Sequence, residues 1–398
     1  MKKMQGMSEG PDQARRGTLR ALVAAAIAGA LPAHVLAAPA EPPACLGPWA
    51  DWRRFVDRHV EDNGRVVDFV NADLRSTSES QSYGLFFALV DNDQLLFERI
   101  LAWTRRNLSN GRPDLYLPAW LWGQSGDGSW RVLDQNTASD GELWIAYALL
   151  EAGRLWNRPG FVQAGRQILA LMNKAEVTEL PGFGTMLLPG NHGYVHAGSW
   201  TLNPCYLPLF AFRRFAAHDR KGPWGRLAER SVALVRQASP NGFAPDWTRW
   251  NGKAFVVDPD KGPMGSYDAI RTYLWAGITS PSDPLRKPLM AALAGPLRML
   301  RAQGAFAEKI DVRNGVGMGA PPPGFAAALL PYLASQGQHA LARAQAALVP
   351  TSGPAADSLT YYDRCLVLFG KGWMDRRYRI AADGRLHPAW STPCSVKR

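Results

Sequence analysis

Several stretches of this sequence are apolar on every face, and this feature limits the possible folds more than any other. The clearest case lies in 139–156, where residues 143–150 read LWIAYALL. A helix that is apolar all round must be buried all round. A buried strand is the alternative, but the cap signal before the run, its continuation to Trp156 and the Ala, Leu and Glu content favour a helix. Such helices are expected to form an inner layer.

Helical spacing and cap signals recur along the chain, whereas period-2 strand patterns are scarce. The 398 residues are 46% hydrophobic, and no shift in composition along the chain marks a linker. One all-α domain is therefore expected over 45–398. Some predicted helices are apolar on every face and others have a single apolar face. Together they predict two concentric layers, in which six helical hairpins close into an (α/α)6 barrel. An open solenoid is the alternative, but no repeat of fixed period supports it. The twelve predicted helices are 49–60, 78–90, 94–107, 139–156, 160–174, 203–217, 223–238, 266–277, 286–302, 324–334, 336–348 and 357–370.

The N-terminus has the features of a signal peptide, expected over 1–37. Arg15 and Arg16 lead into the apolar run 21–31, and residues 34–37 (HVLA) suit a signal peptidase. The run is too short to span a bilayer as a mature helix, so no membrane span is expected in the mature protein. The paired arginines allow twin-arginine (Tat) export, but the match is loose and ordinary Sec secretion fits equally well. A periplasmic or secreted protein is therefore expected.

The charge pattern argues against nucleic acid as a partner. The formal net charge is +11, and the mature part keeps +8, because five basic and two acidic residues precede Ala38. The basic residues are spread singly and form no nucleic-acid motif, so we expect no nucleic-acid binding. Contact with an anionic envelope surface or glycan is compatible with this charge.

Four cysteines and no C-x-x-C pair give no sign of a zinc or redox site. Cys45 and Cys394 lie near the two mature ends in Pro-rich segments, and we expect a disulfide between them. Cys205 and Cys365 lie in apolar surroundings and are expected to be buried thiols. His192 and His196 have the spacing of helical metal ligands but sit in a Gly-rich loop without H-E-x-x-H. No metal and no other cofactor is therefore expected.

Three acidic residues share one setting, the first turn of a helix that then enters the core: Glu79, Asp140 and Asp268. In a ring whose inner helices run the same way, these turns gather at one end and can line one cavity. Glycoside hydrolysis needs two carboxyls there, one protonated to give a proton to the leaving oxygen and one ionised to activate water or attack the sugar. Helix N-termini favour the ionised form, so the acid must be kept protonated by burial or by a nearby negative charge.

The competing interpretation is that these acids only cap helices. Ser139 and Glu142 fit the S-x-x-E capping box, in which the two side chains close the helix start. That box does not require Asp140, which is then free to face the cavity. Aromatic residues near the acids, such as Trp200 and Trp247, could stack on sugar rings, although core packing is as good an explanation for any one of them.

The motifs together resemble glycoside hydrolase family 8, and within it the periplasmic endo-β-1,4-glucanases (cellulases) of bacterial cellulose synthase operons. They occur in family order over nearly the whole mature chain and are highly specific as a set. They are TSESQSYG (77–84), LPAWLWG (117–123), ASDGELWIAYALLEAGRLW (138–156), NPCYLP (203–208), GFAPDW (242–247), SYDAIR (266–271) and YYDRCLVLFGKGW (361–373).

The resemblance implies an (α/α)6 barrel and an inverting endo-β-1,4-glucanase that acts on cellulose or another β-glucan and is linked to bacterial cellulose biosynthesis. The cellulose synthase complex is then a candidate partner, and we expect a monomer. By motif position, Glu79 would be the general acid and Asp268 the general base for water. Asp140 would bind the distorted sugar, and its charge would help to keep Glu79 protonated.

The resemblance also implies residues that contact sugar or orient the base. Tyr267 and Arg271 would orient Asp268 or the water. Trp120 and Tyr206 would contact sugar, and one of Tyr361 and Tyr362 is a weaker candidate.

Two residues depart from the family pattern. Glu142 replaces the second Asp of ASDGD, which keeps the charge on a longer arm and puts a strict geometric role in doubt. Ser80 replaces the usual Gly after the acid and is expected to narrow the approach to Glu79. The alternative functions are a glucan-binding or scaffold protein on the same fold, without activity, and another barrel enzyme such as a polysaccharide lyase.

Overall fold

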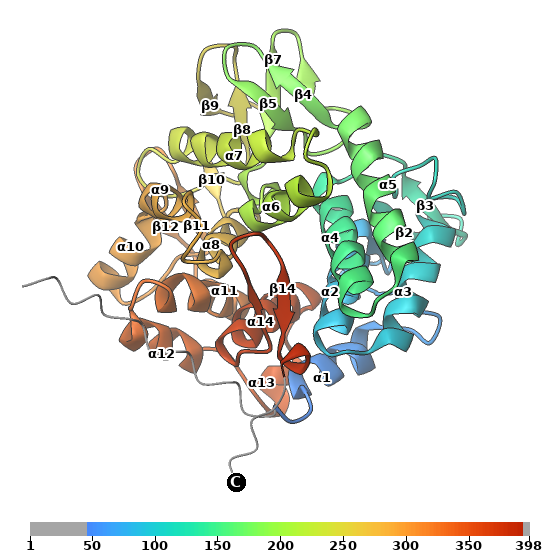
Figure 1. Cartoon of the computed structure of the whole chain (residues 1–398). Helices are drawn as coiled ribbons and strands as arrows, with labels where there is room; N and C mark the ends of the chain where they lie inside the picture. Colours follow the sequence, from blue (N-terminus) through green and yellow to red (C-terminus); the bar gives the residue numbers. More distant parts are fainter. Residues whose placement is uncertain (1–45, 393–398) are drawn as a thin grey trace, which may run out of the picture. The chain divides into compact units, whose positions relative to one another are not determined.

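The apolar stretches form the inner helices of a barrel. A computed structural model describes residues 46–392, which form one compact unit. Six mostly buried helices form the inner layer (Figure 1): α2 (Ser78–Val90), α4 (Ser139–Leu155), α6 (Leu209–His218), α8 (Ala269–Ile278), α11 (Pro323–Ala334) and α14 (Tyr361–Met374).

Amphipathic helices form the outer layer: α1 (Ala50–His59), α3 (Gln94–Asn107), α5 (Pro159–Ala175), α7 (Trp224–Ala238), α9 (Arg286–Ala292), α10 (Gly295–Gln303) and α12 (His339–Ala347). A short helix, α13 (Gly353–Asp357), precedes α14. Each inner helix packs against an outer partner, for example α2 against α3 and α4 against α5. Neighbouring inner helices also pack together, α4 against α2 and α11 against both α8 and α14. The alternation of the layers confirms the predicted all-α (α/α)6 barrel.

Aromatic side chains fill the barrel interior. The ring of Trp144 in α4 is 5.0 Å from that of Phe86 in α2 and 5.2 Å from those of Trp275 in α8 and Phe369 in α14. Phe210 in α6 lies 5.7 Å from the same ring. Aromatic pairs at these separations contribute beyond the burial of their area. Because five inner helices meet at this cluster, it fixes those helices relative to one another.

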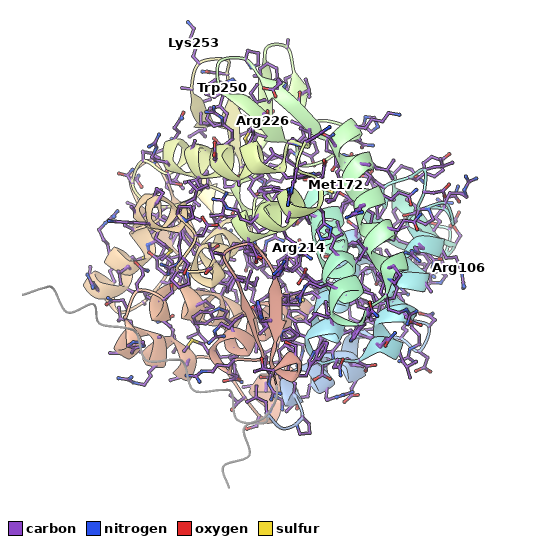
Figure 2. The ribbon with its side chains drawn as sticks, in the orientation of Figure 1. Arg106, Met172, Arg214, Arg226, Trp250 and Lys253 are labelled. Carbon is purple, nitrogen blue, oxygen red and sulfur yellow. The ribbon has the colours of Figure 1, made fainter. Side chains whose placement is uncertain are left out.

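The C-terminal hairpin, which consists of β13 (Tyr378–Ile380) and β14 (Leu386–Pro388), closes one end of the barrel. The Tyr147 hydroxyl donates to a carbonyl of the hairpin at 2.9 Å, and the buried Glu151 carboxylate accepts the Leu386 N–H at 2.8 Å. Glu151 also pairs with Arg214 of α6, which Figure 2 shows directed inward, whereas Lys253 extends outward. These contacts involve the C-terminal half of α4, so the hairpin lies at the opposite end from the first turns of the inner helices.

The strands are short, antiparallel and confined to the connections between helices. They form five small sheets, ordered β1-β2-β3, β4-β5, β6-β7-β8-β9, β10-β11-β12 and β13-β14. The pairing of β1 with β2 sets Ser76 opposite Trp122 just before α2, and β10 leads towards α8. Their bounds are β1 (Ser76–Thr77), β2 (Leu121–Gln124), β3 (Trp130–Asp134), β4 (Val177–Leu180), β5 (Gly184–Leu187), β6 (Val195–His196), β7 (Ser199–Leu202), β8 (Thr248–Trp250), β9 (Phe255–Val257), β10 (Met264–Gly265), β11 (Lys309–Asp311), β12 (Val316–Met318), β13 (Tyr378–Ile380) and β14 (Leu386–Pro388).

Two predicted helices are interrupted. The segment 203–217 begins with a 3-10 turn, η1 (Pro204–Tyr206), and α6 starts only after Pro208. The segment 286–302 is two helices, α9 and α10, and at the break between them the Gly295 N–H donates to Gly242 O at 2.9 Å. A Cβ on Gly295 would lie 2.6 Å from that oxygen, so a glycine is needed at this approach.

Some predictions fall outside the described residues, namely the signal peptide over 1–37 and the bridge between Cys45 and Cys394. Cys205 and Cys365 are buried free thiols, which confirms that prediction. No helix within 46–392 is long and apolar enough to cross a membrane.

Candidate active site

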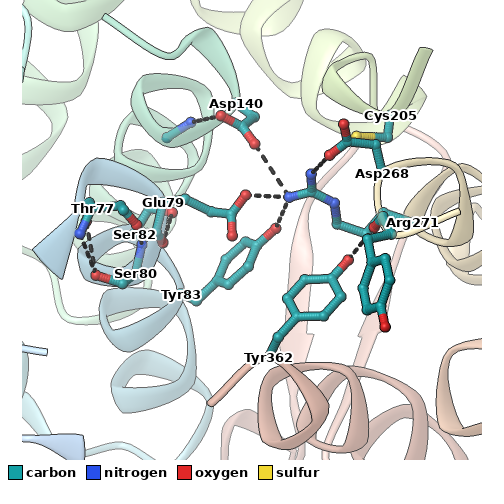
Figure 3. Close-up of polar contacts among 12 residues, drawn as sticks. Thr77, Glu79, Ser80, Ser82, Tyr83, Asp140, Cys205, Asp268, Arg271 and Tyr362 are labelled. Atoms are coloured by element: carbon teal, nitrogen blue, oxygen red, sulfur yellow. Dashed lines mark hydrogen bonds and ion pairs between the residues drawn. The ribbon is translucent and has the colours of Figure 1, made fainter. Parts of the chain in front are cut away.

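Glu79 is the second residue of α2, and other side chains cap this helix. The Thr77 hydroxyl accepts the Ser80 N–H and the Ser80 hydroxyl accepts the Thr77 N–H, both at 2.9 Å, which is a capping box. The Ser80 hydroxyl also donates to Thr77 O at 2.8 Å. The prediction that Ser80 narrows the approach to Glu79 is wrong, because this hydroxyl is held on the backbone, away from the Glu79 carboxyl group (Figure 3).

The predicted capping box of α4 does not form. Ala138 is the N-cap residue, and the buried Ser139 hydroxyl has no hydrogen-bond partner within the described part of the chain. The Ser139 N–H instead donates to Pro189 O at 2.9 Å, so a contact with a distant loop sets the helix start. Glu142 Oε1 accepts the Ala138 N–H at 3.3 Å, rather than the Ser139 N–H that the predicted box required.

One guanidinium joins the three predicted carboxylates. Arg271 Nη1 contacts Glu79 Oε2 and lies 3.3 Å from Asp140 Oδ2, while Nη2 donates to Asp268 Oδ1 at 2.6 Å (Figure 3). The Arg271 side chain is only 5% exposed, so water screens these charges weakly. The structure therefore brings Glu79, Asp140, Asp268 and Arg271 together, although Arg271 contacts all three acids rather than the expected base alone.

Asp140 is the carboxyl group whose surroundings favour a proton. Burial, followed by the negative charge of Glu79, raises the pKa of Asp140 well above its usual range, and Arg271 opposes the rise. In the free protein this direction differs from the expectation that Asp140 is the charged partner that keeps Glu79 protonated.

Tyrosine rings surround the guanidinium. The rings of Tyr206 and Tyr362 each lie 5.9 Å from Arg271 Cζ, within range of cation–π contact. Tyr361 is buried beside His59, so Tyr362 is the member of that pair that contacts Arg271.

Sequence reasoning missed Tyr83, whose hydroxyl accepts a hydrogen bond from Arg271 Nη1 at 3.2 Å. A signal was available, because Tyr83 follows Glu79 by four residues and so lies on the same face of α2. Asp246 was also missed. It belongs to the quoted motif GFAPDW, but its importance depends on contacts with the start of α8, which is distant in sequence. Burial, followed by the charge of Asp268, raises the pKa of Asp246 to about 6.

Two predicted residues lie nearby without contacting the carboxyl groups. Tyr267 is 45% exposed and donates its hydroxyl to Glu308 Oε1 at 3.3 Å, so it lines the cleft but is not hydrogen-bonded to the Asp268 side chain. Trp120 is half-buried, and its carbonyl accepts the Ser78 N–H at 3.0 Å, beside the start of α2. Their contacts with sugar stay predictions.

A cleft of about 490 Å³ opens over the carboxyl groups and is lined by Glu79, Tyr267, Asp268, Arg271 and Tyr362, among others. Aromatic rings continue beyond Arg271. Trp247 lies 6.1 Å from Tyr206, and Tyr194 stacks on Trp247 at 6.0 Å with an interplanar angle of 3°. These rings provide apolar faces on which sugar rings can stack.

Glu142 extends away from the cleft to a second buried carboxyl group, Glu176. Both side chains are fully buried, and the Thr137 hydroxyl donates to Glu176 Oε1 at 2.6 Å. Burial raises the pKa of Glu176 to about 7 and that of Glu142 well above its usual range. The side chain of Glu142 is longer than that of the family Asp. Its carboxyl group therefore lies next to that of Glu176, near the start of α4.

The pair predicts a pH-dependent loss of stability. Because the pKa of Glu176 is raised on folding, its proton stabilises the fold fully below pH 4.5, and this contribution is lost as the pH rises through about 7. The loss should reach up to ~3 kcal/mol in the free energy of unfolding. Glu176→Gln keeps the shape without the ionisation, so it should unfold at a higher temperature than the wild type at pH 8 but not at pH 4.5. Thermal unfolding of both proteins at both pH values measures this difference. The same difference in melting temperature at pH 4.5 and at pH 8 would contradict the prediction.

The site satisfies the demands of acid–base cleavage of a glycosidic bond. Such cleavage needs a carboxyl group that holds a proton, a second carboxylate on the other side of the bond, and surfaces that bind sugar. The Asp140–Glu79 pair and Asp268 lie on different sides of Arg271, next to the tyrosine rings. Fold and site thus define the class as a glycoside hydrolase.

Comparison with known proteins gives the family. The sequence model of glycosyl hydrolases family 8 matches residues 25–376, and the chain belongs to this family. The endoglucanase of Xanthomonas axonopodis pv. citri (strain 306) is 60% identical over 380 residues, 95% of this chain and 98% of that protein. The endoglucanase of Escherichia coli (strain K12) is 40% identical over 351 residues, 87% and 93% of the two chains. The crystal structure of endo-1,4-D-glucanase from Vibrio fischeri ES114 has a TM-score of 0.80 and 38% identity, covering 86% of this chain and 99% of that one.

Proposed function

We propose that this glycoside hydrolase is an inverting endo-1,4-β-glucanase that cuts internal bonds of cellulose or a related β-glucan. The relatives named endoglucanase support the activity. The observation that carries the mechanism is the placement of Glu79 and Asp268 on two nitrogens of one guanidinium. The two carboxyl groups thereby lie on different nitrogens rather than in contact with each other, as an acid and a base must, and the inverting mechanism adds that water fits between base and sugar.

In this proposal Glu79 is the general acid and Asp268 the general base for water, with a carboxyl separation of roughly 6.5–9.5 Å when substrate is bound. Asp140 binds the distorted sugar at the cleavage point, and its place beside Glu79 on the same Arg271 nitrogen gives the acid access to the proton that burial retains there. Arg271 holds the base in place. Tyr206, Tyr267 and Trp120 are assigned to sugar contacts.

We further infer that the enzyme is exported, by the Sec or Tat route, and works as a monomer in the periplasm or outside the cell. The signal features of 1–37 support export. The resemblance of its motifs to endoglucanases of cellulose synthase operons supports a role beside newly made glucan, with the synthase complex as a candidate partner.

A viscosity assay separates the enzyme from a scaffold protein. An endo-acting enzyme should lower the viscosity of carboxymethylcellulose early, while few reducing ends have formed, because cuts within a chain shorten it most. Product profiles on a panel of β-glucans then define the substrate, and ultraviolet absorbance would reveal a lyase. Purified protein that binds the glucan without lowering its viscosity would refute the enzyme proposal.

A further inference from the structure

Asp268 occupies a position in which an aspartate normally caps its own helix. It is the N-cap residue of α8, where an Asp side chain typically accepts an N–H from the first turn. Asp268 makes no such bond, and its carboxylate pairs with Arg271 at 2.6 Å. The N–H groups of Ile270 and Arg271, which such a cap would accept, donate to Ser266 O at 3.0 Å and to Asp268 O at 3.1 Å. The N–H groups of Asp268 and Ala269 are left, and another group must accept them.

Asp246 is that group. Its Oδ1 accepts the N–H groups of Ser266 at 2.7 Å, Asp268 at 3.1 Å and Ala269 at 2.8 Å. The Asp246 N–H in turn donates to Met264 O at 2.8 Å. A carboxylate is well suited to this place, because hydrogen bonds to a charged acceptor are strong and the helix N-terminus favours negative charge.

The segment that carries Asp246 is fixed to α8 by separate contacts. The Ala244 N–H donates to the hydroxyl of Tyr273, one turn into α8, at 2.9 Å. A Cβ on Gly265 would lie 2.1 Å from Ala244 O, so the two segments approach as closely as glycine allows. Asp246 is therefore held in place independently of its own bonds, and it can set the position of Asp268.

We propose that Asp246 is a positioning residue: by accepting the N–H groups of Asp268 and its neighbours it holds the backbone at the start of α8, so that the Asp268 carboxylate faces the cleft. The role rests on the proposed function of Asp268 as the base. Without Asp246, the N–H groups of Ser266, Asp268 and Ala269 lose their acceptor, and the backbone that carries the Asp268 carboxylate shifts. Asp246 does not itself need to touch the sugar.

The test compares kcat and KM of Asp246→Ala, Asp246→Asn, Asp268→Asn and the double variant Asp246→Ala/Asp268→Asn on a soluble β-1,4-glucan, well below the melting temperatures. Asp246→Ala should lower kcat about 100-fold, the usual effect of misplacing a reacting group, with KM changed by less than about twofold. Asp246→Asn keeps an acceptor oxygen and should restore at least a tenth of wild-type kcat. The double variant should be no slower than Asp268→Asn, because Asp246 acts through Asp268.

The matched control is Asp283→Ala. Asp283 is also buried and accepts a backbone N–H, that of Leu285 at 2.8 Å, but lies before the outer helix α9. It should lower the melting temperature and leave kcat unchanged. A lowered melting temperature with wild-type kcat in Asp246→Ala would overturn the positioning role, as would a further loss in the double variant. Activity in Asp268→Asn would instead refute the base assignment itself, so the two failures are distinguishable.

Discussion

Glu79→Gln is expected to lower kcat on an unactivated β-1,4-glucan by about 10²–10⁴-fold, the usual contribution of a general acid. The amide keeps the shape of the side chain but cannot give a proton to the leaving oxygen. The start of α2 should stay intact, because Thr77 and Ser80 form its cap without Glu79. Initial rates of reducing-end release from carboxymethylcellulose, with melting temperatures measured in parallel, test this.

A substrate with a good leaving group sharpens the test of Glu79. A dinitrophenyl cello-oligosaccharide needs little protonation, so Glu79→Gln should lose far less activity on it. Glu98→Gln is the matched control, because Glu98 lies on the surface of α3 and pairs with Arg158 at 3.1 Å; it should keep wild-type activity. Equal losses of Glu79→Gln on both substrates would show that Glu79 is not the acid.

Asp268→Asn should lower kcat by a similar factor, about 10²–10⁴-fold, because the amide cannot take a proton from water. Here a good leaving group should bring no relief, since the attack of water still lacks a base. Azide needs no base and enters from the same side as the water, so it should restore turnover of the activated substrate and yield the α-glycosyl azide.

Asp383→Asn provides the control for Asp268, because Asp383 is an exposed partner of Arg385 at 3.3 Å, and its loss should leave activity unchanged. A β-glycosyl azide from Asp268→Asn, or wild-type rates without azide, would contradict the role of Asp268 as the base.

The barrel was predictable because burial leaves a strong mark on sequence. Runs that are apolar on all faces can only be inner helices, and those at 78–90 and 139–156 became α2 and α4. The predicted bounds of α3 also match the structure. The break before Gly295 was not predictable, because it depends on the close approach of Gly242, a residue distant in sequence.

The site was only partly predictable for the same reason. The three acids could be found from their place at helix starts, but the groups that cap those helices are chosen by tertiary contacts. The Ser139 capping box fits the local pattern, yet a hydrogen bond to Pro189 sets that helix start instead. Asp246 caps α8 from 22 residues before Asp268, which no local pattern indicates. Each proposed catalytic carboxylate thereby stays free for chemistry.

The stereochemistry of the first product tests the central claim most directly, that Glu79 and Asp268 act across a water-sized gap. Proton NMR of fresh hydrolysate from a cello-oligosaccharide distinguishes the two anomers before they interconvert. An inverting enzyme acting on a β-linkage must release the α-anomer first, and the β signal should grow only by mutarotation. Initial release of the β-anomer would contradict the account, because it would require a nucleophilic carboxylate in place of a base.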